Sequence, residues 1–128
     1  MKTLGAELTK VQPGLAEIEM PFNKNFAQHL GYIHAGAITT IVDSACGAAA
    51  WTLMPPGHEI LSIEFKVNFV SPAKGHRFRA RGEVLRPGKA ITATRGEVWA
   101  LDEHGAPKKM VAAMQATMIF VKPPEAKE

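Results

Sequence analysis

Hydrophobic and polar residues alternate with a period of two over most of the second half of this chain, a pattern typical of β-strands. The clearest run is residues 61–69, where Leu, Ile, Phe, Val and Phe alternate with Ser, Glu, Lys and Asn. Similar runs predict strands at residues 76–85, 90–101 and 110–120, with turn residues between them. The second half of the chain should therefore form an antiparallel sheet.

The first half predicts a hairpin, a loop and one helix. Residues 4–11 and 15–20 alternate on either side of Pro13-Gly14, which is turn chemistry. Residues 21–33 have no period, so we expect a loop with room for one helical turn. From residue 36 to about residue 54, proline is absent and apolar side chains occupy nearly every face, which predicts a buried helix.

The order of elements sets the fold class. Met110, Met114 and Met118 would also fit a helical stripe, but the β-branched residues among them favour a strand. The predicted order is two strands, one long helix and four strands, and a single helix needs a wrapped sheet to bury it, so the class is α+β. We expect one domain over residues 1–122 and a flexible tail over residues 123–128.

Composition and charge narrow the function classes. The 128 residues are 46% hydrophobic and 21% charged, which excludes disordered and collagen-like chains. The net charge is +3. The segment from Lys74 to Arg95 contains seven basic residues and one acidic residue, Glu83. An anionic ligand should approach that segment. We expect no nucleic-acid partner, because aromatic residues do not interleave with these charges as a stacking surface requires.

Cysteine and hydropathy indicate the compartment. The single Cys46 excludes a disulfide within the chain and argues against a thiolate metal site, so a reducing cytoplasm is the expected location. Glu7 and Lys10 interrupt any signal-like segment at the start, and no stretch approaches the ~20 apolar residues of a membrane span. We therefore expect a soluble cytoplasmic protein with no membrane partner.

Asp43 is the anomaly in the predicted helix. An unpaired carboxylate in a buried setting costs several kcal/mol, so Asp43 either serves a function or is satisfied by solvent or by a neighbouring hydroxyl group. Cys46 and Gly47, three and four residues further on, leave the helix surface beside the carboxylate bare. That surface has room for a ligand.

A second candidate group lies where the helix begins. His34, Ala35 and Gly36 precede or open the helix, where free N–H groups and the helix dipole stabilise an anion or a developing oxyanion. An ordinary capping role for His34 fits the spacing equally well. Gly36 and Asp43 are two turns apart, ~10 Å along the axis, which one carbonyl would barely span. Two copies of the chain paired head to tail could join these groups, so the spacing favours a site at an interface.

Other catalytic patterns are weaker. Cys46 among alanines is typical of a small core residue rather than of a nucleophile. The five histidines have no metal-site spacing, no G-x-S-x-G nucleophile elbow is present, and no glycine-rich phosphate loop occurs. We therefore expect no metal ion.

Residues 31–36 (GYIHAG) and Asp43 resemble the H-G-G-x6-D signature of hotdog-fold acyl-CoA thioesterases of the phenylacetate-degradation (PaaI-like) type. The resemblance covers about residues 5–121, and its further motifs are residues 44–49, 61–69, 71–75 and 88–89. It implies a hotdog fold, in which an antiparallel sheet wraps one long central helix. It also implies hydrolysis of an acyl-CoA in a site between two subunits, within a homodimer or homotetramer, with no cofactor beyond the CoA of the substrate.

The resemblance also implies roles by position. Asp43 would be the catalytic carboxylate, and His34 would help to place the thioester. The N–H of Ala35, which replaces the first glycine of the signature, would hold the oxyanion with Gly36 beside it. Gln28 stands where relatives carry an Asn that contacts the carbonyl or the water, and it is one methylene longer.

Ser62 stands where some relatives carry a hydroxyl that orients the water, and Gly47 would leave space for the substrate. The phosphates of CoA are expected to meet some of the basic residues Lys74, Arg77, Arg79 and Lys89. Asp43 could deprotonate a water or attack the carbonyl directly, and we favour the water. Aromatic and medium-chain acyl groups fit equally.

Two alternatives stay open. A hotdog enoyl-CoA hydratase would share the fold, although such sites place an Asp before a paired His, whereas here His34 comes first. A non-catalytic acyl-CoA binding module would tolerate the same groove.

Overall fold

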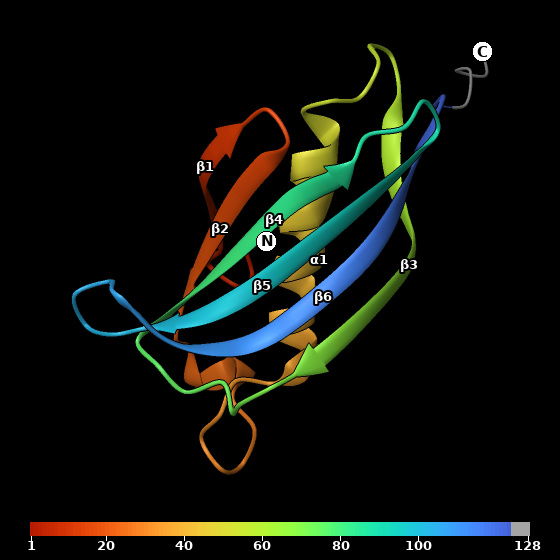
Figure 1. The fold of residues 1–128 in the computed structure, drawn as a ribbon. Coiled ribbons are helices and arrows are strands. Elements are labelled where there is room, and N and C mark those ends of the chain that lie inside the picture. Colours follow the sequence, from red (N-terminus) through yellow and green to blue (C-terminus); the bar gives the residue numbers. More distant parts are fainter. Residues whose placement is uncertain (124–128) are drawn as a thin grey trace, which may run out of the picture.

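The computed structural model describes residues 1–123, which form one six-stranded antiparallel sheet curled around a single long helix (Figure 1). The strand order across the sheet is β1-β2-β4-β5-β6-β3. The strands and helices along the chain are β1 (Glu7–Gln12), β2 (Leu15–Pro21), the short 3₁₀ helix η1 (Lys24–Phe26), α1 (Ala35–Trp51), β3 (Glu59–Phe69), β4 (Arg77–Arg86), β5 (Ile91–Leu101) and β6 (Pro107–Val121). The α+β class and the predicted order of elements are confirmed.

The boundaries differ by a few residues from the sequence-based ones. The first strand begins at Glu7 rather than at residue 4, and α1 ends at Trp51 rather than near residue 54. The predicted helical turn in the loop before α1 is η1. The predicted tail, residues 123–128, lies outside the described residues except for Pro123. Within residues 1–123, no helix has both the length and the hydropathy needed to cross a bilayer.

Helix α1 is buried on one side only, which corrects the expectation of a helix buried all round. Ile38, Ile41 and Val42 are fully buried against the concave face of the sheet. Gly47 is half-buried, and the Trp51 side chain is 61% exposed. The sequence pattern misled because apolar composition does not show which positions a neighbouring element covers, and among the described residues Trp51 is left uncovered.

Two glycines set how closely the helix lies on the sheet. Gly82 on β4 and Gly96 on β5 are direct cross-strand partners beneath α1. A Cβ atom at Gly82 would lie 2.4 Å from the carbonyl carbon of Ala45, and one at Gly96 would lie 2.6 Å from Cγ2 of Val42. Both contacts are too short for real atoms, so the helix rests directly on the strand backbones. The close packing of α1 on these two glycines fixes the position of its third turn, which carries Asp43.

Strand β3 forms one edge of the sheet, and its alternation is broken. The register shifts between Ser62 and Glu64, so the predicted strict period of two over residues 61–69 is wrong at this bulge. Ser62 and Phe65 are opposite Met118 and Ala116, which are buried, and directly opposite residues share a face. Ser62 therefore faces the helix side of the sheet, where a polar group can reach α1.

Candidate active site

The contact that defines the site joins the helix to the edge strand. The hydroxyl of Ser62 donates a hydrogen bond to Oδ1 of Asp43 at 2.8 Å, and Oγ of Ser62 lies 3.1 Å from Sδ of Met118. Asp43 is half-buried rather than enclosed. The hydroxyl of Ser62 provides a hydrogen-bond partner for its carboxylate, which is one of the alternatives that the sequence left open. The bond fixes one carboxylate oxygen and leaves the other available to a ligand or a water.

A hollow of about 380 Å³ opens beside this pair. Its lining is mostly apolar or small, comprising Ser44, Gly47, Ala48, Trp51, Ile60 and Met118 next to Asp43 and Ser62. A Cβ atom at Gly47 would meet nothing within 4 Å, which confirms the bare helix surface expected there. The hollow extends from the carboxylate toward the end of α1 and suits an apolar group.

The start of α1 presents free backbone donors. His34 is the N-cap residue, and its side chain makes no capping hydrogen bond. Its carbonyl accepts the N–H groups of Ala37 at 3.1 Å and Ile38 at 3.3 Å. The N–H groups of Ala35 and Gly36 come before the first helical bond, and both residues are exposed. Free N–H groups at a helix start attract negative charge, and the predicted role of these two groups in holding an oxyanion stays a prediction.

Gln28 lies in the loop that leads to the helix. Its side-chain carbonyl accepts the N–H of Leu30, and its own N–H donates to the carbonyl of Tyr32 at 2.7 Å. Gly31 closes this loop with φ = 89°, a conformation that other residues rarely adopt. No hydrogen bond joins Gln28 to Asp43 or Ser62 in residues 1–123, so the structure holds Gln28 in its own loop, and its predicted contact with substrate stays a prediction.

The predicted phosphate contacts are scattered over the chain. Arg77 and Arg79 both direct Nε to Glu19, at 3.4 and 3.0 Å, on the face of the sheet away from the helix. Lys74 precedes β4 and Lys89 follows it, so the ten residues of that strand, ~33 Å in length, separate them. One chain does not bring the four together, and their contact with CoA stays a prediction.

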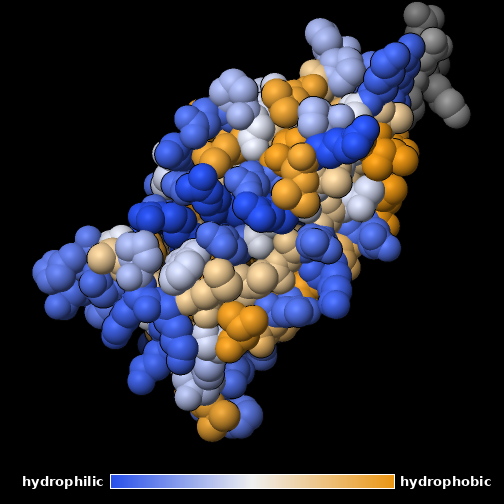
Figure 2. All heavy atoms as spheres, in the orientation of Figure 1, coloured by the Kyte–Doolittle hydropathy of each residue, from blue (hydrophilic) through white to orange (hydrophobic). Residues whose placement is uncertain are grey.

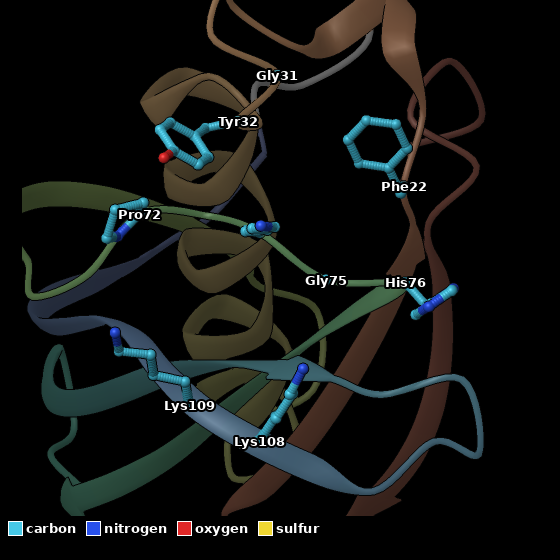
Figure 3. Close-up of a pocket in the computed structure, with 9 residues that line it drawn as sticks. Phe22, Gly31, Tyr32, Pro72, Gly75, His76, Lys108 and Lys109 are labelled. Carbon is cyan, nitrogen blue, oxygen red and sulfur yellow. The ribbon is translucent and has the colours of Figure 1, made fainter.

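Lys74 has neighbours that the sequence did not reveal. It lines a second hollow together with His76, Lys108 and Lys109 (Figure 3). The last two open β6, more than thirty residues further along the chain. Two adjacent lysines after a predicted turn are a common solvent-exposed pattern, and only the fold brings them beside the β3–β4 connection.

Cys46 is buried, and the histidines form no metal site among the described residues. Burial raises the pKa of the Cys46 thiol to about 11, against a smaller lowering by a hydrogen bond with Thr94 and a further rise from the charge of Asp43. A thiol with that pKa holds little thiolate at neutral pH and is a core residue, as expected. Within residues 1–123, no three His, Cys, Asp or Glu side chains are grouped to hold a metal ion.

Comparisons with known proteins agree with this fold. The profile of the Thioesterase superfamily matches residues 30–107, which include Asp43, Ser62 and the start of α1. A solved thioesterase family protein from Silicibacter pomeroyi is 40% identical, with a TM-score of 0.91 over 96% of this chain and 89% of that one. The PaaI protein of Escherichia coli, 18% identical, has the same fold with a TM-score of 0.80 over 94% of this chain and 82% of that one.

Several curated relatives also match in sequence. A Saccharolobus solfataricus protein named among the esterases is 30% identical over 70% of this chain, and the chain spans 64% of that protein. A medium/long-chain acyl-CoA thioesterase of Salmonella typhimurium is 26% identical over 91% of this chain and 81% of that protein. The resemblance to PaaI-like hotdog thioesterases and the hotdog fold are thereby confirmed.

Proposed function

The chain belongs to the Thioesterase superfamily, and on that premise we propose that it hydrolyses the thioester of an acyl-CoA to the free acid and CoA. The observation that carries the proposal is the Asp43 carboxylate, bonded by Ser62 at 2.8 Å beside an open, mostly apolar hollow. The acyl-CoA thioesterase of Salmonella typhimurium supports CoA as the thiol of the substrate.

In the proposed reaction, Asp43 acts as a general base on water. The carboxylate takes a proton from the water while the water oxygen bonds to the thioester carbon. Negative charge on the carbonyl oxygen is stabilised by the N–H groups of Ala35 and Gly36. The C–S bond then breaks, and the proton held by Asp43 passes to the departing thiolate. His34 borders the same helix start and would orient the thioester.

We propose that two copies of the chain share each site. Gly36 and Asp43 stand two turns apart on one helix, ~10 Å, which is too far for one thioester carbonyl and its water. Strand β3 offers a free edge with half-exposed Leu61, Ile63 and Phe65. Figure 2 shows hydrophobic side chains gathered toward the margin formed by β3, whereas the surface over β2 and β4 is mostly hydrophilic. Antiparallel pairing of two β3 edges would run the helices in opposite directions and bring one helix start to the partner's carboxylate.

The hollow beside Asp43 is the proposed acyl site. Gly47 leaves it open, and the indole of Trp51 stands at its far end, two turns beyond the carboxylate. Aromatic and medium-chain aliphatic groups both suit this lining. We expect no cofactor besides the CoA of the substrate, and a cytoplasmic location, where acyl-CoA occurs.

A thiol-release assay on a panel of aromatic and aliphatic acyl-CoAs tests the function, with hydration of crotonyl-CoA measured alongside. We expect free thiol and free acid in equal amounts, and no hydration. Hydration without thiol release would show that the chain is a hydratase and not a hydrolase. Saturable acyl-CoA binding with neither product would make the chain a binding module.

A single turnover in heavy-oxygen water separates the two roles of Asp43. Attack by water puts the label into the acid and leaves the peptide that carries Asp43 unlabelled. Direct attack forms a mixed anhydride, and its opening at the Asp43 carbonyl leaves the label in that peptide. Opening at the acyl carbonyl instead labels the acid, as attack by water does, so trapping with hydroxylamine is the necessary complement. We expect no label in the Asp43 peptide, and hydroxylamine, which traps an anhydride, should leave Asp43 unmodified.

A further inference from the structure

A hollow of about 970 Å³ lies at the end of the molecule where α1 begins. Four separate segments form it: Phe22 lies directly after β2, the loop before α1 supplies Gly31 and Tyr32, the β3–β4 connection supplies four residues, and β6 supplies Lys108 and Lys109. In Figure 3 the rings of Tyr32 and Phe22 stand on one side, and the two lysines reach toward them from the β6 ribbon on the other. The hollow thus combines aromatic faces with ammonium groups.

The lysines of this hollow form no ion pair within residues 1–123. They are Lys74, Lys108 and Lys109. No carboxylate belongs to its lining. Asp102, nearby, is engaged by its own turn: hydrogen bonds from the N–H groups of Ala106 and His104 lower its pKa, with smaller contributions from Lys108 and His76.

The arginines of the sheet face are a contrasting case. Arg77, Arg79, Arg81 and Arg95 are each paired with a glutamate across a neighbouring strand. Their charges are used within the fold and offer little net attraction to a ligand. Of the basic groups between Lys74 and Arg95, Lys74 alone joins the unpaired charge of the hollow.

The hollow adjoins the proposed reaction centre. Gly31 and Tyr32 line it and come just before His34, Ala35 and Gly36 in the chain. The Tyr32 carbonyl is bonded by the N–H of Gln28, which fixes the loop that separates the hollow from the helix start. A thioester whose carbonyl oxygen is held at the helix start has its thiol portion within reach of this hollow.

We propose that this hollow binds the phosphorylated adenosine of CoA, an inference that rests on the proposed function. Three ammonium groups match the phosphates, and an exposed aromatic ring is a stacking surface for a purine; Phe22 is 40% exposed. The hollow then makes the enzyme selective for thioesters of CoA over thioesters of short thiols that lack the nucleotide.

The test compares one acyl group on two thiols. The variant Lys108→Gln/Lys109→Gln is assayed with an acyl-CoA and with the same acyl group on N-acetylcysteamine, which carries no phosphate. We expect KM for the acyl-CoA to rise about tenfold, with kcat unchanged and with the N-acetylcysteamine ester unaffected. The matched control Lys2→Gln/Lys10→Gln loses the same charge outside the hollow and should leave both substrates unaffected.

A rise in KM no larger than that of the control would overturn the proposal while leaving hydrolysis, and thus the proposed function, intact. Absence of acyl-CoA hydrolysis by the unmodified protein would instead defeat the proposed function. Calorimetric titration with adenosine 3′,5′-bisphosphate gives a readout independent of turnover. Binding by the unmodified protein that weakens in the Lys108→Gln/Lys109→Gln variant supports the site, and equal binding by both proteins contradicts it.

Discussion

The two edges of the sheet, β1 and β3, are built differently. Strand β1 has six residues, of which Leu8 and Val11 are apolar, and it is exposed throughout. Strand β3 has eleven residues, six of them apolar, and its Ser62 contacts the carboxylate of Asp43. Both strands carry a bulge, so the bulge alone does not distinguish them. A short, polar edge discourages pairing, whereas a long apolar one invites it. The comparison predicts that a second copy of the chain would pair at β3 rather than at β1.

The largest expected effect is at the carboxylate beside β3. Asp43→Asn should lower kcat by ~100-fold or more, because the amide cannot accept the proton from water. Glu7→Gln on β1 removes a carboxylate from the other edge and should leave kcat unchanged. Steady-state kinetics on one acyl-CoA, with circular dichroism to verify folding, measure both. If Asp43→Asn keeps more than about a tenth of the activity, the catalytic assignment is wrong.

The next effect concerns assembly. Ile63 on β3 and Leu8 on β1 are each 55% exposed, which makes them a matched pair. Ile63→Lys should dissociate the oligomer and lower activity at least about tenfold, because a buried, unpaired ammonium at the interface costs several kcal/mol. Leu8→Lys should change neither. Light scattering at equal protein concentration gives the mass of each variant, and a stable, fully active monomer of the unmodified protein would contradict the shared site.

A smaller effect is expected from the hydroxyl groups of the two edges. Ser62→Ala removes the bond to Asp43 and should lower kcat about tenfold, the equivalent of one hydrogen bond. Thr9→Ala on β1 removes only a hydrogen bond to the carbonyl of Glu17 and should leave kcat unchanged. Ser62→Thr, which restores the hydroxyl, should recover part of the rate. Loss of thermal stability without a change in kcat would assign Ser62 a structural role instead.

The smallest effect is expected where neither edge is involved. Deleting residues 123–128 removes no alternating apolar residue and no site group, so activity should remain near that of the full chain. The melting temperature, read by scanning calorimetry, should change by less than about 5 °C, the equivalent of ~1 kcal/mol. A larger fall would show that this segment docks on the domain.

Local pattern was sufficient for the order of the elements and singled out the candidate site groups, but it did not predict the contacts among them. Asp43 and the start of α1 stand out because a carboxylate and free N–H groups are unusual in an apolar helix. The hydrogen bond from Ser62 to Asp43 joins residues nineteen positions apart and depends on the β3 bulge, which no local sequence pattern predicts. Lys108 and Lys109 were missed for the same reason, since a basic hollow made of four segments exists only in the folded chain.

The paired glycines beneath the helix have a consequence for directed evolution of this enzyme. Gly82 and Gly96 have no side chain, so α1 packs directly against them. A methyl group added at either position would push α1 away from the sheet and move Asp43 away from Ser62. Displacements of ~1 Å can cost ~100-fold in rate. Random libraries should therefore contain variants at these two buried positions that fold and yet are kinetically defective, although neither glycine lines the hollow beside Asp43.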